Sequence, residues 1–151
     1  MKFILLMIRI LELIFNLFNK KLLPQVIIGQ NITGAEVSAI LTPFTTNLWL
    51  SDGIFETINT KNLQDFLAVN DVNTFKYESE RRDCDDFAYM LQGDITRWYP
   101  AGSMGIVWGI CYGNAHAWNF FIDENMKVKF LEPQTDTIFE PTTEQIWIMI
   151  I

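Results

Sequence analysis

The stretch RRDCDDFAYML, residues 81–91, places one thiol among three carboxylates. Asp83, Asp85 and Asp86 surround Cys84, and negative charge this close disfavours a thiolate. The start of a helix has the opposite effect, because its dipole stabilises an anion there. A divalent cation held by the aspartates would also reverse the local field. The stretch therefore has two interpretations. Either a helix dipole or a cation offsets the negative charge around a reactive thiol, or the acidic cluster has another purpose.

A base and an orienting carboxylate for this thiol follow later in the chain. His116 is the single histidine, and the alternation of AHAWNFFID puts it on the apolar, inward face of a strand. The next strand likewise turns Glu132 inward, where a carboxylate needs a partner. The order Cys84, His116, Glu132 supplies a nucleophile, a base and a group that orients the base.

Each of these residues also has a structural interpretation, and the sequence leaves both open. Cys84 is equally explained as a small core residue under a capped helix, and His116 as a hydrogen-bonded core histidine. A strand register shifted by one residue would turn Glu132 outward. Aspartates at a helix start are common as solvated caps. Cys111 is expected to be an inert core residue.

Helices are expected first along the chain and strands later. We predict an apolar helix over residues 3–20, a helix in TKNLQDFLAVN capped by Thr60, and a helix over 83–98. Asp83 caps this last helix, and Asp86 matches the acid of a capping box. GIVWGICYG, AHAWNFFID, MKVKFLEP and EQIWIMII are typical of strands. The expected fold class is α+β, with N-terminal helices packed on an antiparallel sheet in the C-terminal half.

Composition limits the classes of function. The chain has 151 residues, half of them hydrophobic, which suits a single domain over residues 1–151. A net charge of −7 argues against nucleic acid, because phosphate contacts need a basic surface. Two cysteines form no disulfide framework and indicate a reducing compartment. We therefore expect a cytoplasmic protein, with a signal peptide left open.

The apolar N-terminal helix, residues 1–22, has three interpretations. Arg9 and Glu12 interrupt its apolar run, which excludes an ordinary transmembrane span. With Asn16 and Asn19 they form one narrow polar stripe on a helix. Such a helix packs into its own domain, forms a homo-oligomer interface such as that of a homodimer, or lies on a membrane surface.

Three motifs together resemble a known family. DCDDFAYML, AHAWNFFID and FLEPQTD are similar to the papain-like domain at the C-terminus of the Marasmius oreades agglutinin and to phage-encoded relatives of that lectin. The resemblance covers residues 60–137 and implies a papain-like or transglutaminase-like core there. It also implies a calcium-dependent cysteine protease, in which Cys84 is the nucleophile, His116 the base and Glu132 the orienting carboxylate.

The calcium dependence of that family makes Asp85 and Asp86 the first candidate Ca²⁺ ligands, with Asp83 as a further one. The implied activity is that of a cysteine peptidase or amidohydrolase acting on a peptide or protein substrate. Two departures stand against it. We expect no sugar-binding β-trefoil before the domain, so glycan targeting is not implied. The oxyanion-hole donor is also unidentified, since Glu78 stands where a papain-like enzyme has glutamine and Gln64 is a guess.

Two alternatives accompany the protease prediction. The first is a non-catalytic, metal-stabilised binding or structural protein of phage type that keeps a papain-like fold, in a virion or host cell. The second is a cell-wall peptidoglycan amidase, which shares the Cys–His chemistry but acts on another substrate.

Overall fold

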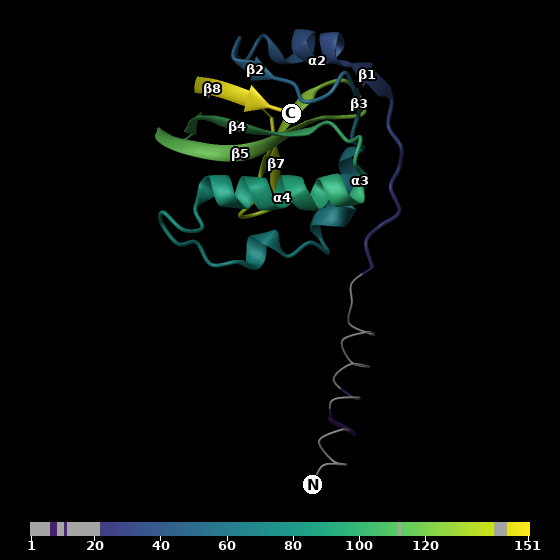
Figure 1. The fold of residues 1–151 in the computed structure, drawn as a ribbon, viewed down its shortest axis with the longest axis vertical. Helices are drawn as coiled ribbons and strands as arrows, with labels where there is room; N and C mark the ends of the chain where they lie inside the picture. Colours follow the sequence, from purple (N-terminus) through teal and green to yellow (C-terminus); the bar gives the residue numbers. More distant parts are fainter. Residues whose placement is uncertain (1–6, 9–10, 12–21, 112, 141–144) are drawn as a thin grey trace.

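A computed structural model of the chain describes residues 7–8, 11, 22–111, 113–140 and 145–151 (Figure 1). Its helical elements are α2 (Gly34–Leu41), α3 (Thr60–Leu67), the 3₁₀ turn η1 (Val72–Thr74) and α4 (Cys84–Trp98). Its strands are β1 (Asn31–Thr33), β2 (Leu48–Trp49), β3 (Ile54–Glu56), β4 (Met104–Cys111), β5 (Asn114–Ile122), β6 (Val128–Glu132), β7 (Thr137–Phe139) and β8 (Gln145–Ile150).

The predicted N-terminal helix falls mostly outside the described residues. Met7, Ile8 and Leu11 are helical and exposed. The roles considered for this segment, in packing, self-association or membrane contact, therefore stay predictions. Within the described part of the chain, no helix is both long and apolar enough to cross a membrane.

The main sheet has six strands in the order β2-β8-β4-β5-β6-β7, and β1 pairs with β3 in a small second sheet. The four strands predicted in the last third all form within the main sheet. The prediction of an antiparallel sheet fails at one edge, where β2 runs parallel to β8. That pairing brings residues 48–49, from a region with no clear pattern, against the C-terminal strand. Sequence periodicity carries no information about such a distant partner.

Helices cover the two faces of this sheet from opposite sides, with α2 on one side and α4 on the other (Figure 1). On the α2 face, Val37 and Leu41 pack with Trp118, Phe120 and Phe130 in one buried cluster. On the α4 face, a second buried cluster gathers around that helix. Its members from α4 and the sheet are Phe87, Leu91, Ile95, Trp98, Met104, Phe121 and Leu131.

One buried amide fixes α4 on the sheet. The side chain of Asn119 is fully buried, and its Nδ2 donates to the carbonyl of Ala88 at 3.0 Å and to that of Gly105 at 3.2 Å. A buried polar group without a partner is costly, so these bonds favour one position of the helix. The start of α4 is thereby held beside β5.

The caps of α4 agree with the prediction, and the cap of α3 differs from it. Asp83 is the N-cap of α4, and its N–H donates to Asp86 Oδ2 at 3.1 Å. For α3, Asn59 and not Thr60 is the N-cap, because Asn59 Oδ1 accepts from the N–H of Asn62 at 2.9 Å. Thr60 is instead the first helical residue.

An extended segment, residues 24–30, runs along α3 and α4 and is held by its main chain. Trp98 Nε1 donates to the carbonyl of Pro24 at 2.8 Å, and Asn62 bonds both the carbonyl of Gln25 and the N–H of Ile27. Further on, the N–H of Gly29 donates to the Tyr99 hydroxyl at 2.7 Å. We call this segment the strap.

Two neighbouring changes in α4 test this packing. Leu91 is fully buried, so Leu91→Ala should lower the free energy of unfolding by about 2–5 kcal/mol. At Gly93 an added Cβ meets nothing within 4 Å, so Gly93→Ala should raise it by about 0.5–1 kcal/mol through helix propensity. Urea unfolding followed by circular dichroism measures both. Equal effects of the two changes would contradict this packing of α4.

Candidate functional site

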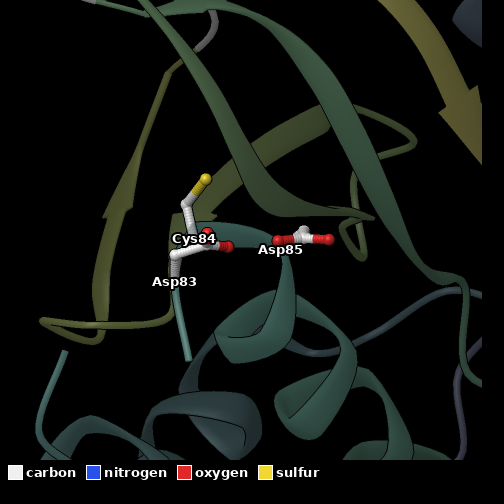
Figure 2. Close-up of side chains that lie close together, drawn as sticks. All are labelled: Asp83, Cys84 and Asp85. Atoms are coloured by element: carbon white, nitrogen blue, oxygen red, sulfur yellow. The ribbon is translucent and has the colours of Figure 1, made fainter. Parts of the chain in front are cut away.

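Cys84 is the first residue of α4, and its sulfur points toward the strands of the sheet while Asp83 and Asp85 lie close beside it (Figure 2). The thiol is half-buried, and the main chain of Ala117 on β5 offers it a hydrogen bond. Cys84 therefore faces the sheet on which α4 packs. Ala117 is next in sequence to His116, so the thiol lies beside the strand that carries that histidine.

Burial raises the pKa of the Cys84 thiol above its ordinary value. The charges of Asp83 and Asp85 raise this pKa further, and the hydrogen bond from Ala117 opposes the rise. The position at the helix start does not overcome these effects. Arg82 offers no compensation, because its guanidinium lies over the Phe75 ring at 5.2 Å from the centroid. The carboxylates therefore favour a protonated thiol.

The carboxyl groups of Asp83 and Asp85 meet each other. One ligand atom each from Asp83, Cys84 and Asp85 lie within 4.8 Å of one another. The contact between the two carboxyl groups raises the pKa of Asp85 and lowers that of Asp83, as expected when they share one proton. Ion pairs among the described residues involve neither group. A hard cation with oxygen ligands fits this pair of carboxylates.

Asp86 has a different role from Asp83 and Asp85. Its Oδ2 accepts the hydrogen bond from the N–H of Asp83, which leaves it as a capping residue. Of the three predicted Ca²⁺ ligands, the structure brings together Asp83 and Asp85. The sequence makes Asp85 a stronger candidate ligand than Asp83, because Asp83 is also expected to cap the helix.

His116 and Glu132 lie together, as the alternation of their strands predicted. His116 Nε2 lies 2.6 Å from Glu132 Oε2, and the other carboxyl oxygen accepts from the N–H of Gln134 at 3.1 Å. The His116 ring stacks on Trp118, with centroids 5.8 Å apart. Glu132 therefore has the inward orientation that the alternation predicted, and not the outward one of a shifted register. The partner that a half-buried glutamate requires is His116.

This pair forms one wall of a cavity of about 210 Å³. We call it the β5–β7 cavity, and its lining residues are Cys111, His116, Glu132, Thr135, Thr137 and Phe139. It offers two hydroxyl groups, an imidazole, a carboxylate and one aromatic ring. Among the described residues, its lining includes neither lysine nor arginine, so it offers no permanent positive charge to an anion. Such a mixture of polar groups and an aromatic wall is typical of sites for small polar ligands.

Sequence reasoning missed most of this lining. Thr135, Thr137 and Phe139 belong to the short strand β7 and the turn before it, which gave no strand pattern. The signal available was the run of polar residues directly after Glu132. Cys111, which was expected to be inert, also lines the cavity. Gln64, the guessed oxyanion donor, is an exposed residue of α3.

Asp136, in the turn that leads to β7, is another residue whose pKa is shifted. Burial raises its pKa to about 6. Its Oδ2 accepts a hydrogen bond from Asn73 Nδ2 at 2.5 Å, which ties the turn to η1. The rim of the β5–β7 cavity is thus fastened to the helical side of the molecule.

Comparison with protein families matches residues 33–150 to the model of the ricin-type β-trefoil lectin C-terminal domain. The chain belongs to this family. The match begins well before residue 60, where the predicted resemblance started, and it includes α2, β2 and β3. A comparison with curated proteins found no significant match.

Solved structures share the fold. A chain described as a PSL1a-E64 complex superposes with a TM-score of 0.72 at 25% identity, over 80% of this chain and 51% of that one. Polyporus squamosus lectin, bound to the human-type influenza-binding epitope Neu5Acα2-6Galβ1-4GlcNAc, superposes with a TM-score of 0.70 at 25% identity. That match covers 80% of this chain and 49% of the lectin. The chain thus spans about half the length of these relatives.

These findings correct several predictions. The papain-like, calcium-dependent cysteine protease family was wrong, because the matching family is that of a lectin domain. The papain-like or transglutaminase-like fold class was wrong, because the shared fold is the β-rich one of the Polyporus squamosus lectin. The predictions of a cysteine peptidase or amidohydrolase, of a peptide substrate and of a peptidoglycan amidase are corrected for the same reason.

The protease prediction was wrong because it inferred reactivity from residue types alone. A thiol, an imidazole and a carboxylate on neighbouring elements suggest a triad, yet the raised pKa of Cys84 opposes an activated thiol. The expectation that glycan targeting is not implied stays a prediction, although the family is named for lectins. Of the alternatives, the non-catalytic binding protein fits best, and the net charge remains unfavourable for nucleic acid.

The thiol pKa has a direct test. In a Cys111→Ala variant, Cys84 should react with iodoacetamide more slowly at pH 8 than the same protein unfolded in urea, because its raised pKa leaves less thiolate. The rate should continue to rise above pH 9. The unfolded protein is the control for the intrinsic reactivity of the thiol. A rate that levels off below pH 8 would show a depressed pKa and contradict this account.

Proposed function

We propose that this chain is a glycan-binding domain of lectin type, which takes a neutral saccharide in the β5–β7 cavity. One observation carries the proposal: in a member of a lectin family, a hydrogen-bonded histidine and glutamate, two threonines and a phenylalanine line one hollow. Sugar hydroxyls both donate and accept hydrogen bonds, which matches the carboxylate, imidazole and hydroxyl groups of the lining. Phe139 offers an apolar surface for the C–H face of a sugar ring.

Charge favours a neutral saccharide over an acidic one. The chain has a net charge of −7, and the cavity lining carries a carboxylate without any lysine or arginine. A sialic acid carboxylate would meet like charge at Glu132. The glycan bound by the Polyporus squamosus lectin contains such a group, but this chain spans only half of that protein. We therefore propose a neutral disaccharide such as Galβ1-4GlcNAc as the better ligand.

Removing lining groups should weaken binding of Galβ1-4GlcNAc, measured by chemical-shift titration of the labelled protein. His116→Ala should raise Kd by about tenfold, because it removes one hydrogen-bonding group and leaves Glu132 without its partner. Thr137→Val, which keeps the side-chain shape, should raise Kd by about fivefold through the lost hydroxyl. Thr42→Val, on the end of α2, is the matched control and should leave Kd unchanged.

The sialylated trisaccharide provides the charge test. Neu5Acα2-6Galβ1-4GlcNAc should bind more weakly than the neutral disaccharide. Stronger binding of the sialylated glycan would contradict the charge argument, and absence of binding to either glycan would contradict the proposed function.

We further propose that Asp83 and Asp85 bind Ca²⁺ at the start of α4. The contact between their carboxyl groups supports this, because a cation can replace the proton that they share. Asp86 continues to cap the helix and is not needed as a ligand. The sulfur of Cys84 is a poor ligand for calcium, which prefers oxygen.

Calcium should raise the melting temperature. A hundredfold excess over Kd adds about 2.7 kcal/mol to the free energy of unfolding, because Ca²⁺ binds the folded chain. EDTA should reverse the effect, and Asp85→Asn should abolish it. Asp65→Asn, which changes an exposed carboxylate of α3, is the control and should respond to Ca²⁺ like the wild type. An equal calcium response in Asp85→Asn would contradict the site.

A further inference from the structure

The strap turns large aliphatic side chains toward solvent. Its main chain is bonded to side chains of α3 and of the end of α4, and Val26 packs against the buried cluster around α4. With the main chain held in this way, the side chains of Ile27 and Ile28 are 55% and 76% exposed. Leu22 and Leu23, directly before the strap, are exposed as well. Aliphatic groups that are held outward in this number indicate a surface with an apolar partner.

The sequence before the strap continues this apolar surface. On the predicted N-terminal helix, at 3.6 residues per turn, the polar side chains of residues 1–20 fall within about 100° of one side. They are Lys2, Arg9, Glu12, Asn16, Asn19 and Lys20. Met7, Ile8 and Leu11 belong to the remaining, apolar side and are exposed. An apolar side this wide exceeds the stripe with which a helix packs on its own domain.

This apolar segment and the rest of the chain carry opposite charges. Residues 1–22 contain four of the eleven basic residues and, at Glu12, one of the eighteen acidic ones. The segment therefore carries a charge of +3 and the remaining chain one of −10, which together give the net charge of −7. Lys2, Lys20 and Lys21 lie at the two ends of the apolar run, where lysine can reach lipid phosphates while the residues between are buried. This division of charge favours an anionic partner for the segment.

We propose that residues 1–28 bind the surface of an anionic lipid bilayer. The apolar side of the N-terminal helix and the aliphatic side chains at 22, 23, 27 and 28 enter the boundary between headgroups and acyl chains, and the basic side chains contact lipid phosphates. The strap holds the domain beside the bilayer, because its main chain is bonded to α3 and α4. The lectin-domain match begins only at residue 33, and glycan binding in the β5–β7 cavity is independent of this surface.

A protein partner explains these features less well. A surface of the same domain or of a second copy contacts a helix from one side and leaves much of the wide apolar side in water. A second copy also brings its own acidic domain, of charge −10, toward that of the first, and like charges repel. A bilayer surrounds the apolar side and supplies negative charge to the basic residues at the same time.

Co-flotation of the full chain with vesicles tests the proposal. Binding to phosphatidylcholine mixed with phosphatidylglycerol should be at least about tenfold stronger than to phosphatidylcholine alone, and should weaken with added salt. Ile27→Ser combined with Ile28→Ser should lower binding by about tenfold, because two aliphatic side chains no longer enter the bilayer. Both are exposed and the strap docks through its main chain, so the fold is kept. Ile54→Ser, at an exposed isoleucine of β3, is the matched control and should leave binding unchanged.

A second pair of variants tests the charge. Lys20→Gln combined with Lys21→Gln should lower binding to the mixed vesicles by about tenfold and leave binding to phosphatidylcholine unchanged. Lys76→Gln combined with Arg81→Gln removes the same charge from exposed positions of the domain. This control pair should change binding by less than about twofold.

Three results would overturn the lipid surface. The first is a chain that floats with neither kind of vesicle, and the second is equal binding to both kinds. The third is a loss of binding in Ile54→Ser as large as in the Ile27→Ser, Ile28→Ser pair. If no vesicle binds and that pair dissociates a dimer in analytical ultracentrifugation, the exposed strap is an interface with a second copy, and the lipid surface is overturned.

Discussion

The side-chain amide of Asn119 holds the arrangement of this domain together. It is a fully buried polar group within the largely apolar contact between α4 and the sheet, and it bonds the main chain of both α4 and β4. Hydrophobic packing alone is not directional, so it would allow the helix to slide along the strands. The amide removes that freedom, since a shift of α4 would leave a buried donor without its acceptors. This bond therefore helps to hold Cys84, at the start of α4, beside β5.

Local features of the chain were predictable because they depend on neighbours in sequence. The cap of α4 at Asp83, the bond to Asp86 and the inward faces of His116 and Glu132 follow from side-chain chemistry and strand alternation. The parallel pairing of β2 with β8 was not predictable, because it joins residues about a hundred positions apart. β7 was missed for a related reason: three residues with one polar member give too little pattern.

The candidate site shows where residue types mislead. Cys84, His116 and Glu132 are of the residue types that form nucleophilic triads, and the fold brings their elements together. The reactivity of a thiol depends on its solvation and on the electrostatic field around it. The spacing of residues in the sequence reveals neither. Burial and two neighbouring carboxylates raise the pKa of Cys84. The proposed glycan binding, by contrast, depends on the shape and polarity of the β5–β7 cavity, whose lining comes from several strands and a turn.

The strap carries a consequence for how related sequences can vary. Its contacts run through main-chain atoms of Pro24, Gln25, Ile27 and Gly29, while the side chains of Ile27 and Ile28 are largely exposed. Substitution at the exposed positions therefore leaves the docking intact. Gly29 is different, because a Cβ there would lie 1.8 Å from the carbonyl oxygen of Thr57. As far as docking is concerned, related sequences should therefore vary freely at the exposed positions of the strap, and should be restricted at Gly29 and at Val26, whose side chain packs against the buried cluster around α4.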